Sequence, residues 1–363
     1  DSKNSLMVIP APKDSVPYSG DFEIPLSLKI TKTESNGEQH TDYIPVNKID
    51  QQAFSGTSIT SIKMGHVTEI GNNAFYNCTK LTKVYFWDLE HLFNITYRNE
   101  YANPLYSAKH LYIGSDEKEV KTLRIPETIT TIPRYALAGC ENLDTVFIPA
   151  SVRSIGDNAF QNCKNLKRSQ FDSFNALCNI TFANKEANPL YYTHHLFVGD
   201  DEITTIDIPN DIVTISTAAF AGGEGITEVI IPNSVRYIGN DAFYGCNNIN
   251  TVNYPSLDAL RYDITYGNTN SNPIRYARMC LINGSEQSSL TINQDIKDYA
   301  FYGAKWLEKV TIENGASSIG AAAFRECLNL KSVTINGALE AIKNDAFNGC
   351  TNITEVQLPP SLK

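Results

Sequence analysis

The chain contains 363 residues with 40 acidic and 30 basic side chains, so its formal net charge is −10. Its hydrophobic content of 42% excludes a disordered chain, and no apolar run approaches the roughly 18 residues of a membrane-spanning helix. The net negative charge, without blocks of Lys or Arg, also argues against a nucleic-acid partner.

Residues 1–45 contain turn signals and one apolar run. The chain starts at Asp1 without an initiator Met, so we expect a processed or trimmed form. The run 22–31 predicts a strand, and Ser35-Asn-Gly-Glu38 predicts a hairpin turn before Tyr43. We interpret 1–45 as an N-terminal cap with a β-hairpin; the alternative is a separate ligand-binding module.

From residue 46 onward one phrase recurs, Ile-x-x-x-Ala-Phe, followed three positions later by a small residue. The copy at Ile70, Ala74, Phe75 and Cys78 is typical. The Phe position is filled, in order, by Phe54, Phe75, Leu137, Phe160, Phe220, Phe243, Phe301, Phe324 and Phe347. Such repetition at a fixed period indicates a repeat architecture.

Three variant copies carry Asn-Pro-Leu or Asn-Pro-Ile instead of Ala-Phe. They begin at Asn103, Asn188 and Asn272, and an Ile lies ten residues before their Leu or Ile, instead of five before the Phe. With them the pattern predicts about twelve coils over residues 46–363, grouped in a larger repeat of roughly 83 residues.

The second half of each coil reads Leu-x-x-Val-x-Ile, as at Leu143, Val146 and Ile148. Its alternation predicts one short strand per coil, with every second side chain in the core. A single coil cannot bury its Ile, Phe and Val by itself, so the coils must stack. We therefore predict a β-rich α/β fold, a right-handed solenoid with a long parallel sheet on one face.

The repeats resemble those of BspA-like bacterial surface proteins, a group of the leucine-rich repeat superfamily. The segments 151–163 and 234–246 carry the resemblance most clearly, and it extends over 46–363. The resemblance implies a curved solenoid displayed outside the cell, at its surface, and adhesion to host or matrix proteins. It implies no catalytic motif and no conserved set of binding residues.

Each variant coil is followed by an insertion with a short apolar strand and an acidic, Gly-containing turn. The insertions start at His110, His195 and Cys280. We predict protruding hairpins or extended loops on one side of the stack, which either form a binding face or cover a sheet edge.

The Cys and His residues provide little evidence for a metal site or a catalytic site. Six of the eight Cys fill the small-residue position, so buried free thiols are expected; a disulfide such as Cys140–Cys163 is the alternative. No Cys-x-x-Cys, phosphate loop or nucleophile elbow occurs, so we predict no metal, no cofactor and no catalytic residue. We expect a structural role for His194 and His195.

The outward positions of the strands offer the best candidate site. In the N-terminal half they hold Lys83, Tyr85, Arg124, Phe147, Arg168 and Gln170. Exposed aromatic and Arg side chains are typical of binding hot spots, so these six residues are the predicted binding site. The alternative is an ordinary sheet face.

Three functions follow from these observations. The first is a surface adhesin or protein-interaction scaffold that binds an extracellular host or matrix protein. The second is a glycan-binding surface protein, suggested by tyrosines after the Asn-Pro motif: Tyr106, Tyr191, Tyr192 and Tyr276. The third, an enzyme, is disfavoured because no nucleophile or carboxylate pair was found.

Overall fold

A computed structural model describes residues 5–12, 17–33, 38–114 and 118–359. The chain forms two compact units, residues 1–172 and 173–363. Each is a stack of coils that contribute a parallel strand apiece to one face, so the predicted β-rich repeat fold is confirmed. Within the described ranges, no helix combines the length and apolar character needed to cross a bilayer.

The strand face of the first unit is built from coil-by-coil parallel pairing. One sheet contains, in order, β2 (Ser19–Glu23), β5 (Ser58–Lys63), β7 (Lys83–Phe86) and β9 (Leu111–Ile113). The strands that follow are β10 (Thr122–Arg124), β12 (Thr145–Ile148) and β14 (Arg168–Phe171). Strand order is interrupted between β9 and β10, where the first insertion leaves the coil. The face thus consists of shorter sheets instead of one continuous ladder.

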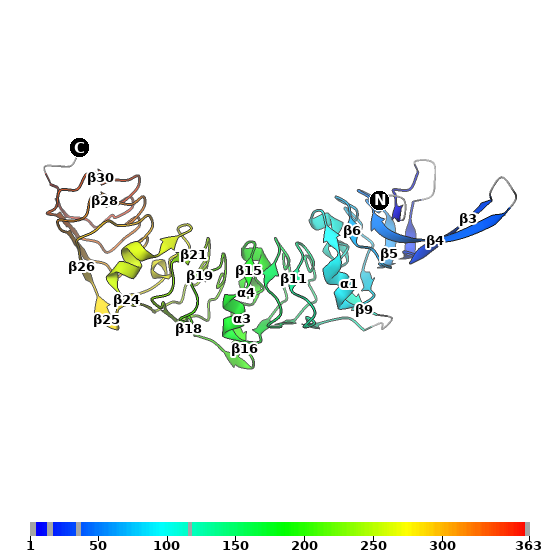
Figure 1. Cartoon of the computed structure of the whole chain (residues 1–363), viewed down its shortest axis with the longest axis horizontal. Coiled ribbons are helices and arrows are strands. Elements are labelled where there is room, and N and C mark those ends of the chain that lie inside the picture. Colours follow the sequence, from blue (N-terminus) through cyan, green and yellow to red (C-terminus); the bar gives the residue numbers. More distant parts are fainter. Residues whose placement is uncertain (1–4, 13–16, 34–37, 115–117, 360–363) are drawn as a thin grey trace. The chain divides into compact units, whose positions relative to one another are not determined.

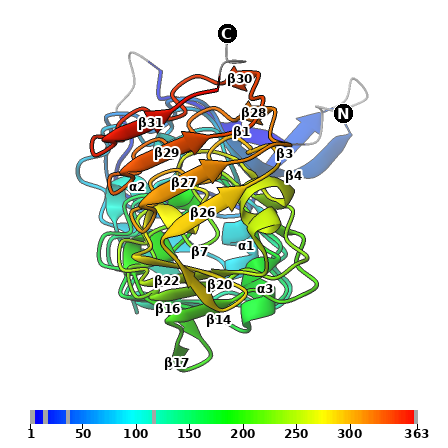
Figure 2. The same cartoon turned by 90° about the vertical axis from the view of Figure 1, so that its left-hand side faces the viewer.

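The second unit repeats this arrangement. In the insertion that starts at His195, β16 (Leu196–Val198) pairs with β17 (Asp201–Glu202). One sheet contains β18 (Thr205–Asp207), β20 (Glu228–Ile230), β22 (Thr251–Tyr254), β24 (Met279–Ile282) and β25 (Ser285–Gln287). Another contains β26 (Ser289–Ile292), β27 (Lys309–Ile312), β29 (Ser332–Ile335) and β31 (Glu355–Gln357), whose parallel order is visible in Figure 2.

A second set of strands, only two residues long, forms at the Ile of the repeat phrase or, in the variant coils, directly after it. In the first unit these are β6 (Glu69–Ile70), β8 (Thr96–Tyr97), β11 (Thr131–Ile132) and β13 (Ser154–Ile155). In the second unit they are β15 (Thr181–Phe182), β19 (Thr214–Ile215), β21 (Tyr237–Ile238), β23 (Thr265–Tyr266), β28 (Ser318–Ile319) and β30 (Ala341–Ile342). The sequence pattern did not predict them, because two residues are too short to show alternation.

The N-terminal segment joins the stack and also extends away from it. β2 pairs in parallel with β5, and β1 (Leu6–Val8) pairs in parallel with β4 (Gln39–Ile49). β3 (Ser27–Thr33) pairs antiparallel with β4, and this hairpin extends from its coils in Figure 1. The single strand predicted over 22–31 is therefore two strands with different partners. Of the predicted turn, Ser35, Asn36 and Gly37 lie outside the described residues.

The variant coils contain the helices. In the first unit these are α1 (Leu89–Asn94), η1 (Glu100–Ala102) and α2 (Leu105–Ala108). In the second they are α3 (Phe174–Cys178), η2 (Lys185–Ala187), α4 (Leu190–Thr193), η3 (Ala259–Asp263) and η4 (Pro273–Arg275).

The Asn of the Asn-Pro motif links its coil to the next one. Asn103 is fully buried, and its Nδ2 donates to the carbonyls of Tyr135 and Ala136, at 2.7 and 3.0 Å. Its Oδ1 accepts from the Leu105 backbone N–H at 2.9 Å. Asn188 repeats all three bonds in the second unit, and Asn272 repeats the bond to one carbonyl, that of Ala300, and the bond from the Ile274 N–H. An amide provides both donor and acceptor, so it satisfies buried backbone groups at this turn.

The repeated Phe and Cys positions form the core. The rings of Phe301 and Phe324 stack at 5.0 Å, as do those of Phe54 and Phe75 at 5.1 Å. All eight Cys are free thiols, and seven of them are buried. The Cys163 thiol donates to the Leu137 carbonyl of the preceding coil at 3.3 Å. A Cys at the small-residue position therefore also donates a hydrogen bond to the preceding coil, which the sequence did not reveal.

Candidate binding surface

The six predicted site residues all lie on the strand face of the first unit. Each alternates with a buried neighbour, such as Val84 between Lys83 and Tyr85. The strands divide the six into two groups. Lys83 and Tyr85 lie on β7, whereas the other four lie on β10, β12 and β14.

Arg124, Phe147 and Gln170 form one row across three strands. Arg124 is the register partner of Phe147, and Phe147 is the register partner of Gln170. The Arg124 guanidinium lies 3.6 Å from the centre of the Phe147 ring. Arg168 Nε donates to Gln170 Oε1 at 3.2 Å on the same strand. The row thus presents a cation over an aromatic face, next to an amide.

The β7 pair is completed by Tyr112 on β9, a residue that sequence analysis missed. The Tyr85 and Tyr112 rings lie 4.9 Å apart, and Lys83 Nζ lies 5.9 Å from the Tyr112 ring centre. Tyr112 belongs to the first insertion, whose apolar strand was identified without assigning its face. Its register with Tyr85 could have been inferred only from the strand pairing.

An acidic group borders this pair. Asp21 on β2 accepts hydrogen bonds from Ser61 Oγ at 2.6 Å and Thr60 Oγ1 at 2.8 Å. The Ser61 bond, then the Thr60 bond and the nearby Lys83 charge, hold the pKa of Asp21 below its ordinary value. Asp21 is therefore an anion at neutral pH and offers an acceptor beside the cation of Lys83.

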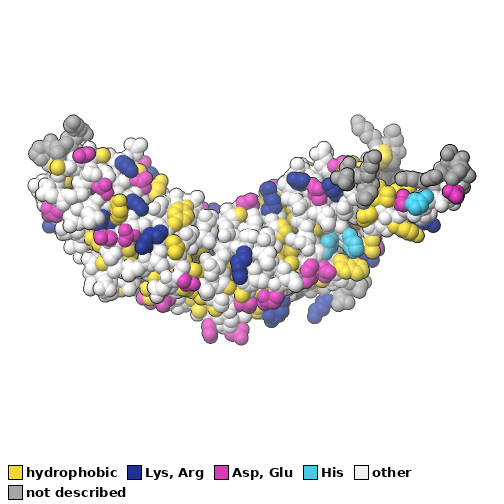
Figure 3. Space-filling view, in the orientation of Figure 1, with side chains coloured by type: hydrophobic (Ala, Val, Ile, Leu, Met, Phe, Trp, Pro, Cys, Tyr) yellow, Lys and Arg dark blue, Asp and Glu magenta, His cyan; other side chains and the backbone are white. Residues whose placement is uncertain are grey.

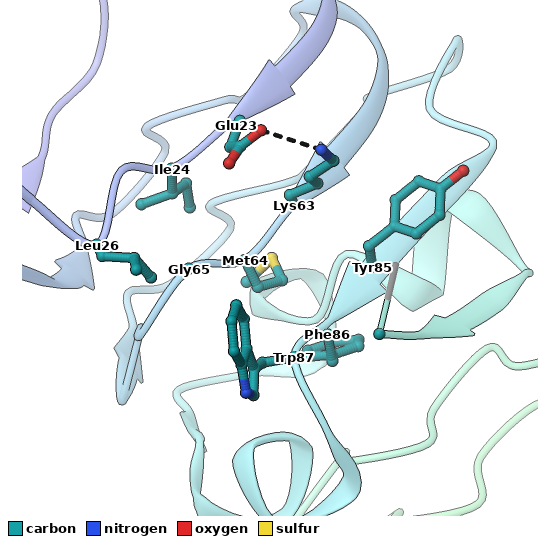
Figure 4. Close-up of a pocket in the computed structure, with 10 residues that line it drawn as sticks. Glu23, Ile24, Leu26, Lys63, Met64, Gly65, Tyr85, Phe86 and Trp87 are labelled. Carbon is teal, nitrogen blue, oxygen red and sulfur yellow. Dashed lines mark hydrogen bonds and ion pairs between the residues drawn. The ribbon is translucent and has the colours of Figure 1, made fainter. Parts of the chain in front are cut away.

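A pocket of about 410 Å³ lies where β2, β5, β7 and β9 end. Ile24, Met64 and Phe86 are buried in its floor, and Leu26 and Trp87 are exposed at its wall. Figure 4 shows these side chains around the pocket, with the 3.1 Å ion pair between Glu23 and Lys63 at its rim. Tyr85 also lines it, so the pocket adjoins the predicted site.

The backbone approaches closely where this pocket is formed. Gly65 has φ +54°, and a Cβ there would lie 2.6 Å from the Ile24 carbonyl oxygen. A side chain at this position would push the two segments apart, so glycine permits the contact between them.

Trp87 is presented outward by the turn that starts α1. The Asp88 carboxylate caps this helix by accepting from the His91 backbone N–H at 2.6 Å, so the chain turns directly after Trp87. The indole is 63% exposed and meets the His66 ring edge-on at 6.1 Å. On the face drawn in Figure 3, apolar surface lies beside histidine side chains over the first unit. The sequence pattern did not identify Trp87 as a site residue, although its position directly after a predicted strand was a usable signal.

The insertions form the predicted hairpins where they are described. β16–β17 and β24–β25 are antiparallel pairs, and Tyr112 bridges Glu119 in the first insertion, whose residues 115–117 lie outside the described part. His195 Nδ1 contacts Glu202 Oε1 at 2.5 Å across the turn. His110 and Glu119 make the equivalent contact at 2.5 Å. These contacts agree with a structural role for His195.

The tyrosines after the Asn-Pro motif have different environments. Tyr106 lines a shallow pocket, whereas Tyr191 contacts Tyr192 at 5.2 Å and Tyr244 at 6.2 Å. Tyr276 is partly buried, and burial raises its pKa to about 12. Among the described residues, no three His, Cys, Asp or Glu side chains gather in a way that could hold a metal ion.

Comparison with known proteins identifies the repeat. The family described as "BspA type Leucine rich repeat region" matches residues 41–104, 115–188, 190–272 and 280–363, in six copies. A comparison with curated proteins found no match.

Several solved structures are similar to this chain. One is a leucine-rich repeat protein from Bacteroides ovatus, 22% identical, with a TM-score of 0.47, covering 95% of this chain and 84% of that chain. A leucine-rich repeat protein from Eubacterium ventriosum is 17% identical, with a TM-score of 0.46 and coverages of 92% and 90%. A leucine-rich cell surface protein from Faecalibacterium prausnitzii is 20% identical, with a TM-score of 0.37 and coverages of 100% and 86%.

Proposed function

This chain belongs to the BspA-type leucine-rich repeat family, and on that premise we propose that it is an extracellular, cell-surface adhesion scaffold. In this proposal it binds a host or matrix protein through the strand face of its first unit. The observation that carries the proposal is the continuity between the Trp87 pocket and Tyr85. An exposed indole, an apolar pocket and outward aromatic side chains follow one another along the ends and faces of the same strands.

The composition of this surface favours a protein as the ligand. Interface cores are enriched in Trp, Tyr and Arg, and a few such residues contribute most of the binding energy. Trp87, Tyr85 and Arg124 are of these types. Each strand adds about 4.8 Å to the face, so β2 to β9 together span roughly 15 Å. A protein contact of ordinary size, about 800 Å² on each partner, would extend beyond one pocket.

The charges suggest what the partner presents. Lys83, Arg124 and Arg168 are cations on a chain whose net charge is −10. Trp87 and Leu26 add apolar surface at the strand ends. A partner that combines an apolar side chain with nearby carboxylates would therefore match this surface, because opposite charges guide association and fix its register.

The test is binding of the purified chain to immobilised matrix proteins, plasma proteins and glycans. The variant Tyr85→Ala/Arg124→Ala/Phe147→Ala is compared with Trp87→Ala and with a matched control. The control is Thr291→Ala/Thr311→Ala/Thr334→Ala, which changes one register row on the strand face of the second unit. We expect saturable protein binding that both site variants weaken at least tenfold and the control leaves unchanged.

Other outcomes would contradict parts of this proposal. Equal binding by all variants would move the site away from this face. Absence of binding to every protein of the panel would count against broad matrix adhesion. Surface location has a separate test, in which a protease added to intact cells should remove the protein.

A second function, glycan binding, is favoured by a specific observation in the first variant coil. Tyr106, which follows the Asn-Pro-Leu motif, lines a pocket together with two further tyrosines. Tyrosines and small polar residues line this pocket, whereas the pocket beside Trp87 has a mainly apolar lining.

A further inference from the structure

A pocket of about 320 Å³ lies beside the first variant coil, away from the strand ends. Tyr76, Tyr101 and Tyr106 line it, together with Asn77, Thr79 and Ser107. Residues 76–79 precede β7 in the coil, whereas Trp87 follows β7. The two pockets share no lining residue, so a ligand in one does not require the other.

The three rings form a corner. Tyr76 and Tyr101 lie 5.1 Å apart at 87°, and Tyr101 and Tyr106 lie 5.1 Å apart at 77°. Tyr76 is 50% exposed, and the other two rings are partly buried. Perpendicular rings present faces in different directions, so a ligand in the corner can contact one face and one edge.

The corner is held in place by neighbouring coils. The Tyr106 hydroxyl accepts from Asn162 Nδ2 at 3.2 Å, and Ser107 Oγ donates to the Phe75 carbonyl at 3.1 Å. Tyr106 belongs to α2, whose first residue is tied by the buried Asn103. A side chain that is already fixed in the free protein loses less conformational entropy when a ligand binds. A ligand that makes only a few contacts can therefore still bind at this corner.

The polarity of the lining defines the ligand class. The lining contains no Lys, Arg, Asp, Glu or His. Its polar groups are phenol and alcohol hydroxyls and an amide, which both donate and accept hydrogen bonds. The lining itself offers no counter-ion to a charged ligand, and Lys109, whose Nζ lies 5.1 Å from the Tyr106 ring centre, is already paired with Glu141 at 3.1 Å. A pyranose instead has a C–H face that packs on aromatic rings and hydroxyls that match these groups.

We propose that the Tyr76–Tyr101–Tyr106 corner is a binding site for a neutral pyranose residue of a glycan. This proposal is independent of the protein-binding role proposed for the strand face, because the two use different residues. It deepens the glycan alternative by assigning it a site and a ligand class.

The second variant coil provides an internal comparison. At the corresponding sequence positions the second copy has Gln161, Glu186 and Tyr191, so it lacks two of the three rings. Lys185 Nζ there lies 5.6 Å from the Tyr191 ring centre and 4.4 Å from that of Tyr244. Lys109 likewise lies 5.1 Å from the Tyr106 ring centre, so the two coils differ in the two missing rings, and Tyr191 is a suitable control position.

The test is saturation-transfer NMR with titration of three probes against the full chain. The probes are methyl β-galactopyranoside, N-acetyllactosamine and the anionic 3′-sialyllactose. We expect a neutral probe to bind with a Kd near or below about 1 mM. Tyr76→Ala and Tyr101→Ala should each weaken it at least fivefold, whereas Tyr191→Ala and Trp87→Ala should not. Tyr101→Phe should retain most of the affinity if the ring face is the contact.

Three results would overturn the proposal. These are no transfer to either neutral probe at about ten times that concentration, unchanged affinity in both Tyr→Ala variants, or sialyllactose binding tenfold tighter than the neutral probes. Circular dichroism checks that each variant is folded. Should Tyr101→Ala unfold the coil, Tyr76→Ala still decides, because half of the Tyr76 side chain is exposed.

Discussion

The guanidinium of Arg124 lies over the ring of Phe147, its register partner on the neighbouring parallel strand, at 3.6 Å from the ring centre. A cation over an aromatic face at an exposed site contributes about 0.5–1 kcal/mol. The pairing also orders a long side chain on a surface proposed to bind a partner, so less entropy is lost on binding.

Arg124→Ala and Phe147→Ala should therefore have coupled effects on partner binding. We expect each single substitution to weaken binding by about 1–2 kcal/mol, and the double substitution by less than the sum, because each removes the same contact. Surface plasmon resonance with the captured partner measures this cycle. Thr311→Ala, on the second unit, is the control, and strictly additive losses would show that the pair does not act as a unit.

Trp87→Ala should reduce partner binding by about 2 kcal/mol with little loss of fold stability, because the indole is 63% exposed. Trp306 is the matched contrast, since it is only 7% exposed. Trp306→Ala should lower the free energy of unfolding by about 3–5 kcal/mol through the cavity it leaves.

Urea unfolding and the binding assay, applied to both Trp variants, separate the two effects. A large stability loss in Trp87→Ala would mean that this indole is part of the core. Unchanged partner binding in that variant would remove the pocket from the proposed site.

Asn103→Ala should be among the most destabilising substitutions in the first unit. It leaves two backbone carbonyls and the Leu105 N–H without their side-chain partner in a buried turn. We expect a loss of about 2–4 kcal/mol in unfolding free energy. Asn329→Ala is the control, because this exposed amide makes a single bond, to the Lys305 carbonyl. Equal effects of the two substitutions in urea unfolding would contradict the proposed role of the buried Asn.

The eight thiols should differ sharply in reactivity. Burial raises the pKa of Cys140 to about 12, whereas a hydrogen bond with Cys327 lowers the pKa of the partly exposed Cys350. Because the thiolate is the reactive form, Ellman's reagent at pH 8 should label Cys350 first and the buried thiols only after denaturation. Cys350→Ala should abolish the fast phase. Fewer than eight reactive thiols in the denatured, unreduced chain would reveal a disulfide.

Acid should weaken the ion pairs around Glu69. Arg98, then Lys48, hydrogen-bonds this carboxylate and holds the pKa of Glu69 below its ordinary value, against a smaller effect of burial. A carboxyl group whose pKa is lower in the folded than in the unfolded state stabilises the fold at pH values above its unfolded-state pKa of about 4.3. This stabilisation is lost as pH falls through the folded-state pKa.

Glu69→Gln should therefore lower the unfolding free energy by about 0.5–1 kcal/mol at pH 7. The difference from the parent chain should shrink steadily below pH of about 4. Urea unfolding across this range measures it, with Glu340→Gln, at an exposed position, as the control. A difference independent of pH would assign the effect to packing instead of charge.

Much of the fold could be predicted because each coil repeats the same apolar spacing. The Ile, Phe and Val positions identified the buried side chains, and the Asn-Pro motif identified the variant coils, but not the short helices that these coils contain. The split of 22–31 into β2 and β3 could not be predicted, because local alternation is the same whichever strand becomes the partner. The two-residue strands at the Ile positions were missed for a related reason, since their pairing comes entirely from neighbouring coils.

The candidate site was predicted less completely. Strand alternation correctly assigned Lys83, Tyr85, Arg124 and Phe147 to the outward face, but it did not identify Tyr112, Trp87 or the tyrosine corner. These residues approach one another across sequence separations that follow no single period. Tyr76 and Tyr106, for example, reach one pocket from different coils.

By itself, the sequence determined the repeat, its buried positions and the family to which the chain belongs, because these depend on residue spacing along the chain. The tertiary structure decided which outward side chains meet, where the pockets open, and which buried amides and thiols bond to the preceding or following coil. The physical reason is that stacking places side chains from successive coils beside one another, and pockets and hydrogen bonds depend on those lateral distances.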